Sequence, residues 1–205
     1  MKSTNLKPYY QDESVTIYHG DSREIVPQLG RFDLLLTDPP YGIGIAKNPI
    51  RQKHEKMEWD SSAPEWWFLE YISHRASKSV IWGGNYFPLK PAKCFLIWDK
   101  KQPQDFSLAM VEQAWTNYDM PAKMFSKRVV GYHKNHPTQK PVELMQWCIT
   151  LSVENVQTIL DPFAGSGTTG RAAKDLGKKA TLIEMEESYC EVAAKRMEQE
   201  CFNFE

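Results

Sequence analysis

Short apolar runs alternate along the chain with longer segments in which apolar residues recur at helical spacing. The runs are rich in β-branched and aromatic residues, which predicts buried strands. These runs are Val15–Tyr18, Leu34–Thr37, Val80–Trp82, Phe95–Trp98, Thr158–Leu160 and Thr181–Ile183. The helical spacing predicts helices over Glu65–Lys78, Pro141–Leu151, Thr168–Leu176 and Glu187–Gln199. Strands that alternate with helices indicate an α/β fold, with a mostly parallel sheet and helices on both faces.

Length and composition describe an ordinary globular chain. Its 205 residues, without a repeat or a linker-like tract, predict a single domain over residues 1–205. No segment is apolar enough to cross a membrane or to act as a leader, and the four cysteines lack a CxxC spacing. We therefore expect a cytoplasmic protein without a membrane partner. The formal net charge of -1 argues weakly against a nucleic-acid partner.

A glycine-rich turn follows the fifth predicted strand. In parallel sheets ligands bind beyond the carboxyl ends of the strands, and Gly165, Gly167 and Gly170 have the GxGxxG spacing that lets a ligand approach the backbone. Glu184, at the end of the next strand, is placed to accept hydrogen bonds from ribose hydroxyls. No GK[ST] sequence follows the glycines, which excludes a P-loop. A cofactor that contains ribose is expected.

Two kinds of cofactor remain open, a nicotinamide or flavin dinucleotide and S-adenosylmethionine. A dinucleotide fold usually begins with its glycine loop, whereas only 35 residues follow Gly170 here. The other strands must come from the N-terminal part of the chain, so the motif order is circularly permuted. This order favours S-adenosylmethionine. Asp21, after the first predicted strand, could contact the adenine amino group or merely cap a turn.

The tetrapeptide Asp38–Tyr41, DPPY, directly follows the second predicted strand. Pro40 has no N–H, so the chain there is stiff and the carbonyl of Pro39 stays available. The Asp38 carboxylate and this carbonyl could accept both hydrogens of an exocyclic base amine and free its lone pair for attack on a sulfonium methyl group. Tyr41 would stack on the base, which must leave the duplex to reach such a pocket.

Together these motifs resemble those of the S-adenosylmethionine-dependent DNA amino-methyltransferases, the family that modifies adenine N6 or cytosine N4. The matching sequences are TDPPYG (37–42), HPTQKP (136–141), LDPFAGSGTTG (160–170) and IEMEESY (183–189). With the catalytic motif ahead of the cofactor loop, the order is similar to that of the β class. The likeness extends from Val15 to Arg196 and implies a Rossmann-like methyltransferase fold.

The resemblance also implies the site residues. Those of the catalytic motif are Asp38, Pro39, Pro40 and Tyr41. Those that would bind the cofactor are Asp21, His136, Thr138, Gln139, Lys140, Asp161, Phe163, Gly165, Ser166, Gly167, Thr168 and Glu184. No metal site is expected, because no cluster of ligands completes the pair His133 and His136.

The charge of the chain is unevenly distributed. Residues 122–140 carry a net charge of +5, residues 47–56 a net charge of +3 and residues 184–205 a net charge of -5. Both basic stretches flank motifs that should face DNA. The expected DNA contacts are Lys47, Arg51, Lys53, Lys123, Lys127, Arg128 and Lys134. We expect a DNA-facing loop around residues 42–63 and a short recognition segment around residues 101–135. Three possibilities for recognition stay open: a short DNA site, a homodimer that shares recognition between two copies, or the stretch that follows the catalytic motif.

The expected function is transfer of the methyl group of S-adenosylmethionine to adenine N6 in double-stranded DNA, on a flipped base. Adenine rather than cytosine follows from the resemblance, because Asp rather than Ser opens the catalytic motif. The alternatives are a cytosine-N4 DNA methyltransferase, an enzyme that methylates RNA or a protein amide, a catalytically silent DNA-binding regulator on the same fold, and a dinucleotide oxidoreductase.

Overall fold

The computed structural model describes residues 6–42, 63–103, 109–128, 139–151 and 155–199. Nine strands form one sheet in this part of the chain. They are β1 (Tyr10–Gln11), β2 (Val15–His19), β3 (Phe32–Thr37), β4 (Ala76–Trp82), β5 (Phe95–Asp99), β6 (Val111–Thr116), β7 (Lys123–Ser126), β8 (Thr158–Asp161) and β9 (Lys179–Glu184). Their order across the sheet is β1-β2-β9-β8-β3-β4-β6-β5-β7.

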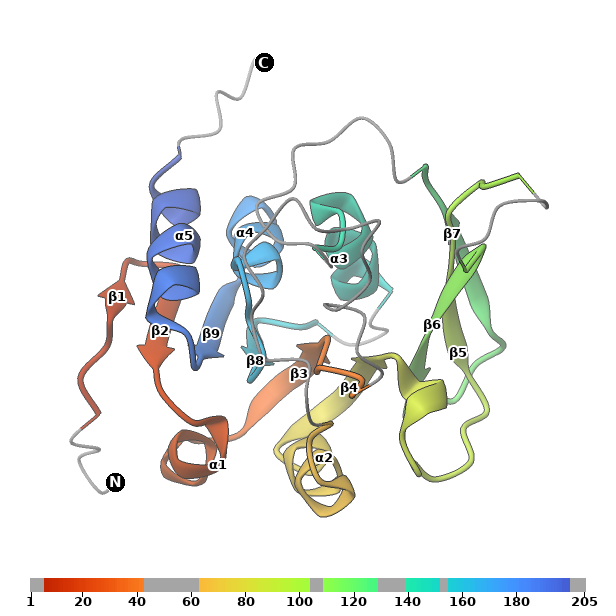
Figure 1. Cartoon of the computed structure of the whole chain (residues 1–205), viewed down its shortest axis with the longest axis horizontal. Coiled ribbons are helices and arrows are strands. Elements are labelled where there is room, and N and C mark those ends of the chain that lie inside the picture. Colours follow the sequence, from red (N-terminus) through yellow and green to blue (C-terminus); the bar gives the residue numbers. More distant parts are fainter. Residues whose placement is uncertain (1–5, 43–62, 104–108, 129–138, 152–154, 200–205) are drawn as a thin grey trace.

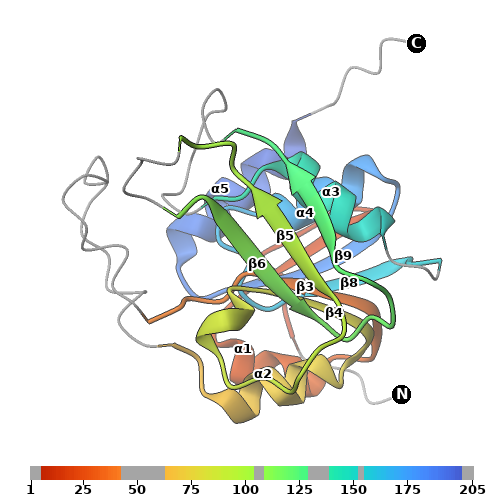
Figure 2. The same cartoon turned by 90° about the vertical axis from the view of Figure 1, so that its right-hand side faces the viewer.

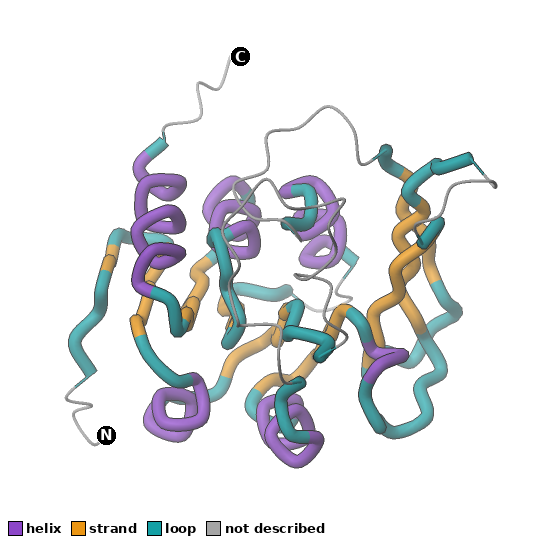
Figure 3. Tube along the Cα trace, viewed as in Figure 1, coloured by secondary structure: helices purple, strands orange, loops and turns teal. Residues whose placement is uncertain are grey.

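Helices cover both faces of the sheet (Figures 1 and 3). They are α1 (Ser22–Ile25), α2 (Trp66–Ser73), α3 (Val142–Thr150), α4 (Thr168–Asp175) and α5 (Glu187–Glu198), with 3-10 turns over Val26–Gln28 and Gly84–Tyr86. In Figure 1, α3, α4 and α5 lie above the sheet, and α1 and α2 lie below it. Strands β2, β9, β8, β3 and β4 pair in parallel, and β6 runs antiparallel between β4 and β5. The predicted α/β fold with a mostly parallel sheet is confirmed.

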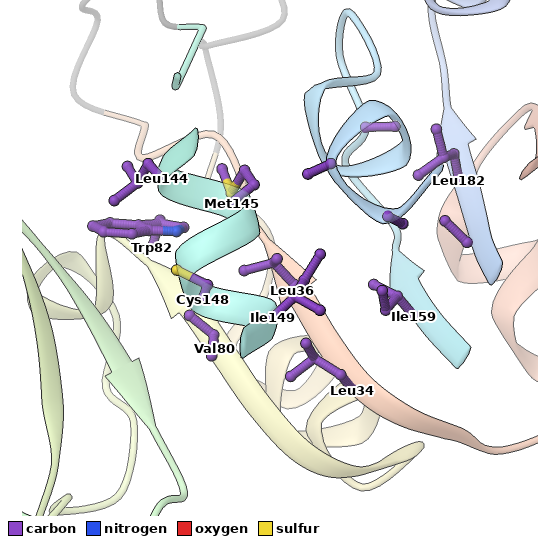
Figure 4. Close-up of a cluster of buried hydrophobic side chains, with 14 of the residues drawn as sticks. Leu34, Leu36, Val80, Trp82, Leu144, Met145, Cys148, Ile149, Ile159 and Leu182 are labelled. Atoms are coloured by element: carbon purple, nitrogen blue, oxygen red, sulfur yellow. The ribbon is translucent and has the colours of Figure 1, made fainter. Parts of the chain in front are cut away.

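The apolar core is divided by the sheet into two layers. Successive strand residues point to opposite faces, so both must be apolar where both faces are covered. Leu34 and Leu36 of β3 belong to the layer under α3, which Figure 4 shows packed across β3 and β4. Leu35, between them, belongs to the opposite layer with Phe68 and Leu69 of α2. The continuous apolar run of β3 follows from this double burial.

Strands β3 and β8 are neighbours although more than 120 residues separate them in the chain. The chain passes from β8 through α4 to β9 on one side and from β3 through α2 to β4 on the other. Ligands bind at such a reversal of strand order, beyond the carboxyl ends of the strands. There, the hydroxyl of Thr37 donates a 2.7 Å hydrogen bond to Oδ1 of Asp161. The permuted motif order thus brings the catalytic motif beside the glycine loop.

The helix predicted over Glu65–Lys78 is wrong at its C-terminal end. Helix α2 ends at Ser73, and the chain enters β4 at Ala76. Residues 76 and 78 pair with Phe32 and Leu34 of β3, and these interactions outside the segment outweigh the helical spacing.

The segment 101–135, predicted to read DNA, contributes two strands to the sheet. Figure 2 shows β6 and β7 beside β5 at one end of the molecule. Strand β6 is paired on both sides, with β4 and with β5. Among the described helices, none is both long and apolar enough to cross a membrane.

Candidate functional site

A cavity of about 680 Å³ opens at the carboxyl ends of β3, β8 and β9. It brings together residues from the catalytic motif, the glycine loop and the start of α3, which are far apart in the sequence. The predicted site residues that line it are Asp21, Asp38, Pro40, Gln139, Lys140, Asp161, Phe163, Gly165, Ser166, Thr168 and Glu184.

Three predicted site residues do not line this cavity, namely Pro39, Tyr41 and Gly167. Gly167 precedes α4 with φ of +78°, and a Cβ there would lie 2.8 Å from the Cβ of Ala193 in α5. Its role in the structure is therefore close packing of α4 on α5. His136 and Thr138 lie outside the described residues.

The Asp38 carboxylate is held by two groups. Its Oδ2 lies 2.5 Å from Nζ of Lys140, and its Oδ1 accepts a 2.6 Å hydrogen bond from the hydroxyl of Tyr41. Lys140 also donates to the Tyr41 oxygen at 3.2 Å. Burial raises the pKa of Asp38 against the opposing charge of Lys140. Lys140, which the resemblance assigns to the cofactor, thus contacts the catalytic carboxylate.

A second half-buried carboxylate completes this ionic network. Oε2 of Glu112, on β6, lies 3.2 Å from Nζ of Lys140, and its Oε1 lies 2.5 Å from Nζ of Lys100. Because β6 runs antiparallel, its first residues lie at the edge where β3 ends. Burial disfavours the charged carboxylate, but Lys140 and Lys100 together lower the pKa of Glu112 to about 2. The network of Asp38, Glu112, Lys100 and Lys140 therefore contains two negative and two positive charges.

The ring of Tyr41 is covered by protein. It stacks on Tyr86 with 4.8 Å between ring centroids, and a Cβ on Gly83 would lie 2.1 Å from the ring. Gly83 also has φ of +70°, so a side chain at this position would be strained as well as obstructed. Tyr86 is 46% exposed. A base can stack on Tyr41 only where Tyr86 gives way, and the exposed ring of Tyr86 is an alternative stacking surface.

Two carboxylates lie around the glycine loop. Glu184 accepts hydrogen bonds from the N–H groups of Gly165 at 2.7 Å and Glu186 at 2.9 Å, and its burial raises its pKa. Asp161 accepts hydrogen bonds from Thr37 and from the N–H of Phe163, and burial raises its pKa to about 6. A Cβ added to Gly165 would meet no atom within 4 Å, so the loop borders open space.

Asp21 caps a helix and also lies in the cavity wall. Its carboxylate caps α1 by accepting from the N–H of Arg23 at 2.8 Å, and the Arg23 side chain pairs with it at 2.6 Å and lowers its pKa. It also lines the cavity. Capping and ligand contact are therefore compatible at this residue.

The charged side chains of the cavity lining are mostly acidic. It contains two cationic side chains, Arg23 and Lys140, and six carboxylates, namely Asp21, Asp38, Glu65, Asp161, Glu184 and Glu186. A surplus of carboxylates attracts a cation and repels the pyrophosphate of a dinucleotide.

Three of the predicted DNA contacts lie in the described chain, at β7. Lys123 begins this strand, and Lys127 and Arg128 follow its end. Lys127 lies 2.5 Å from Glu143, so part of its charge is already compensated. Lys47, Arg51, Lys53 and Lys134 lie outside the described residues.

The predicted DNA-facing loop begins and returns beside the cavity. A Cβ on Gly42 would lie 2.8 Å from the nitrogen of Ala63, so the two ends of the loop are in contact. Ala63 and Pro40 both line the cavity. Among the described residues, no group of three or more histidines, cysteines and carboxylates is arranged to hold a metal ion.

Sequence reasoning missed Glu112 as a neighbour of Asp38. Glu112 has the sequence pattern of a solvent-facing residue in a half-polar strand, and only the reversed direction of β6 makes it part of the site. Lys100 and Tyr86 follow predicted strands, and on that ground the sequence makes the segments 83–87 and 98–100 candidates for the target pocket or ordinary strand ends.

Comparison with known proteins identifies relatives of this chain. Residues 97–195 match the DNA methylase family. The type II methyltransferase M2.DpnII of Streptococcus pneumoniae is 25% identical over 256 residues, which cover 95% of this chain and 93% of that protein.

Solved structures of DNA methyltransferases share the fold. The M1.HpyAVI–SAM complex has a TM-score of 0.60 at 23% identity and covers 90% of this chain and 100% of that one. The cytosine-N4-specific PvuII DNA methyltransferase has a TM-score of 0.66 at 19% identity and covers 98% of this chain and 92% of that one. In sequence and fold the chain is thus a relative of the DNA methylases, and it resembles the S-adenosylmethionine-dependent DNA methyltransferases that modify adenine N6 or cytosine N4.

Proposed function

We propose that this protein transfers the methyl group of S-adenosylmethionine to the exocyclic N6 amine of adenine in DNA. One observation carries the proposal: a single cavity has the Asp38 carboxylate, suited to an amine, and the Glu184 carboxylate, suited to ribose hydroxyls, in its walls. An amino group and a nucleoside can therefore occupy the same cavity.

The residues of the cavity fit S-adenosylmethionine. Glu184 is placed to accept from the ribose, Asp21 from the adenine amine, and Phe163 offers an apolar ring. The surplus of carboxylates favours a ligand with a net positive charge. When bound, this cofactor supplies an electrophilic methyl group on a sulfonium.

In the proposed mechanism Asp38 and Pro39 orient the target amine. The carboxylate of Asp38 and the carbonyl of Pro39 accept its two hydrogens, which turns the nitrogen lone pair toward the methyl group. As the nitrogen–carbon bond forms and the carbon–sulfur bond breaks, the amine becomes cationic and must lose one proton. Asp38 is the nearest carboxylate, and burial raises its pKa in the direction that favours this uptake.

Lys140 and Glu112 keep Asp38 in the required charge state. Burial alone would lower the pKa of Lys140, but Asp38 and Glu112 together raise it, so Lys140 stays charged. This charge holds Asp38 ionised before the transfer. After Asp38 takes up the proton, Glu112 remains as the partner of Lys140. Lys140 therefore keeps an anionic partner throughout the reaction, although Glu112 is then shared with Lys100.

The proposal requires a base outside the double helix, because an amine inside the stack cannot reach a buried carboxylate. Unstacking costs a few kcal/mol, which aromatic stacking partly offsets. Tyr41 serves as the stacking ring once Tyr86 gives way, or Tyr86 takes that role. A DNA substrate in a bacterial cell would place the protein in the cytoplasm.

We further propose a homodimer as the DNA-binding form. Strands β6 and β7 place part of the segment expected to recognise DNA within the sheet, so a second copy would add recognition surface to that of one chain. Light scattering of the protein with and without a DNA duplex tests this, and a monomer in both samples would contradict it.

Product analysis tests the reaction. The protein is incubated with labelled S-adenosylmethionine and unmethylated duplex DNA, and the DNA is digested to nucleosides for mass spectrometry. We expect labelled N6-methyl-2′-deoxyadenosine. Labelled N4-methyl-2′-deoxycytidine would overturn the choice of adenine alone. The absence of any labelled nucleoside would overturn the proposed reaction, and parallel samples with RNA and with protein would then identify another acceptor.

A further inference from the structure

Arg196, on α5, is a buried cation that contacts the walls of the cavity from behind. It is 8% exposed. Its Nη1 donates to Oγ1 of Thr168 at 2.9 Å, and its Nη2 donates to Oε1 of Gln139 at 3.1 Å. Both acceptors line the cavity. The side chains of Thr168 and Gln139 therefore lie between the guanidinium and a ligand in that part of the cavity.

Both groups that accept from Arg196 are uncharged. Within the described part of the chain, no carboxylate lies within ion-pair distance of this guanidinium. The nearby Arg171, in contrast, pairs with Asp175. Burial lowers the pKa of Arg196, and the charge of Arg171 lowers it further. A buried charge without a counter-charge is destabilising by several kcal/mol in general, so an anion close to Arg196 would be stabilised.

The arrangement around Arg196 favours an anion at one particular wall of the cavity. Gln139, Ser166 and Thr168 form this wall, and Ser166 lies 3.4 Å from the same Gln139 oxygen that accepts from Arg196. The amide of Gln139 is thereby fixed with its oxygen toward Arg196 and Ser166. Thr168 begins α4, whose N-terminus adds a partial positive charge. Glu184 and Asp38 adjoin this wall, but each is already held by another donor, Glu184 by the N–H of Gly165 and Asp38 by Lys140.

We propose that Arg196 is a positioning residue that provides the counter-charge for the carboxylate of the amino-acid part of S-adenosylmethionine. The inference rests on the proposed function. With Glu184 assigned to the ribose and Asp38 to the target amine, the wall of Gln139, Ser166 and Thr168 remains for the amino-acid part, which alone among the parts of this cofactor carries a carboxylate. Arg196 acts on it through its field and through the fixed orientation of Gln139 and Thr168.

A pair of ligands that differ by one group tests this role. The full-length protein is titrated calorimetrically, without DNA, with S-adenosylmethionine and with decarboxylated S-adenosylmethionine, which lacks only the carboxylate. We expect Arg196→Gln to weaken binding of S-adenosylmethionine about tenfold and to leave the affinity for the decarboxylated compound unchanged. Arg196→Lys, which keeps the charge, should restore most of the loss. Should Arg196→Gln not fold, Arg196→Met, which preserves most of the volume, takes its place.

Lys195→Gln is the matched control. It removes one positive charge from the same helix, but Lys195 is exposed and pairs with Glu191. We expect it to change neither affinity. An equal loss of both ligands in Arg196→Gln would show a purely structural role and overturn the inference, as would no loss of either. If the unmodified protein binds neither ligand, the proposed function itself falls, and this inference falls with it.

Discussion

Asp38 carries the proposed chemistry, yet its carboxylate already has partners on both oxygens. Lys140 lies on one and Tyr41 donates to the other. Each carboxylate oxygen has two lone pairs, so a base amine can bind without displacing either partner. The existing contacts fix the carboxylate before the substrate arrives, and a fixed acceptor needs no reorganisation during the reaction.

Substitution of Asp38 should separate methyl transfer from cofactor binding. We expect Asp38→Ala to lower kcat by at least about a thousandfold, because the acceptor of the amine hydrogens and of the released proton is lost. The affinity for S-adenosylmethionine should stay within about threefold, because the ribose is held elsewhere. Single-turnover methylation and calorimetry measure the two effects.

Glu184→Ala provides the contrasting variant. It removes the carboxylate assigned to the ribose and should weaken cofactor binding about tenfold or more, with a smaller effect on transfer at saturating cofactor. An active Asp38→Ala protein would be incompatible with the mechanism, and unchanged cofactor affinity in Glu184→Ala would remove Glu184 from the cofactor site.

Asp161 should make the protein less stable as pH rises through the weakly acidic range. Its pKa is about 6 in the folded protein, against an ordinary value of 3.8. Between these values the native state holds a proton that the unfolded state has lost, so the free energy of unfolding falls as pH increases, by about 3 kcal/mol in all. Urea unfolding from pH 4 to 7 measures this slope. Asp161→Asn should flatten it, and an unchanged slope would show that Asp161 is not its source.

At the scale of elements, the spacing of apolar residues predicts those strands and helices that the local sequence pattern determines. The six predicted strands all appear in the sheet, because apolar runs such as Leu34–Thr37 are buried on both faces. Strands β6 and β7 are not delimited by the sequence pattern, because both contain polar residues that face water or the site. The end of α2 was misplaced because β3 pairs with the residues that follow it.

Only those residues of the candidate site that belong to sequence motifs could be predicted. Asp38, Glu184 and the glycine loop were found because they follow strands in recognisable patterns, and the relatives confirm that resemblance. Glu112 and Arg196 were not found. Each comes from an element outside the motifs, and its importance depends on which element packs beside it rather than on its own sequence context.

Strand β6 contributes the charge of Glu112 to the ionic network, and a double substitution can isolate the effect of this charge on stability. Glu112→Gln leaves Lys100 and Lys140 with only Asp38 for compensation, and we expect it to destabilise the fold by about 3 kcal/mol. Lys100→Met in the same chain restores the balance of one cation and one anion. The double variant should therefore be more stable than Glu112→Gln alone. Urea unfolding of the single variant Glu112→Gln, of the double variant and of Lys100→Met alone completes a double-mutant cycle with the unmodified protein.

The charge of Glu112 also predicts how the stability of the fold depends on pH in the acid range. Because the pKa of Glu112 is lowered to about 2 from 4.5, its stabilising contribution is complete above pH 4.5 and is lost as pH falls toward 2. Glu112→Gln should abolish this part of the acid destabilisation.

The double substitution also has an outcome that would contradict it. If Glu112→Gln alone and Glu112→Gln combined with Lys100→Met are equally stable, the four charges do not act as one network.

At the scale of the whole molecule, a net charge of -1 conceals a separation of charge along the chain. The parallel strands all end at the edge that holds the cavity, and β7 runs parallel to β5. Lys127 and Arg128 therefore follow β7 at the same edge of the sheet as the cavity, whereas Lys123 begins the strand about 10 Å away toward the opposite edge. Because Lys127 is paired with Glu143, Arg128 is the cation of this group best placed for DNA.

The salt dependence of DNA binding should distinguish these positions. Each phosphate contact contributes about 0.9 to the slope of log K against log salt concentration. We expect Arg128→Gln to reduce the magnitude of this slope by about 0.9, the contribution of one phosphate contact. Lys127→Gln should reduce it by less, and Lys123→Gln hardly at all. Fluorescence anisotropy with one duplex between about 50 and 200 mM salt measures the three slopes. Equal slopes for Arg128→Gln and Lys123→Gln would mean that DNA does not approach β7 from the edge that holds the cavity, and the substrate would then have to reach Asp38 from another side.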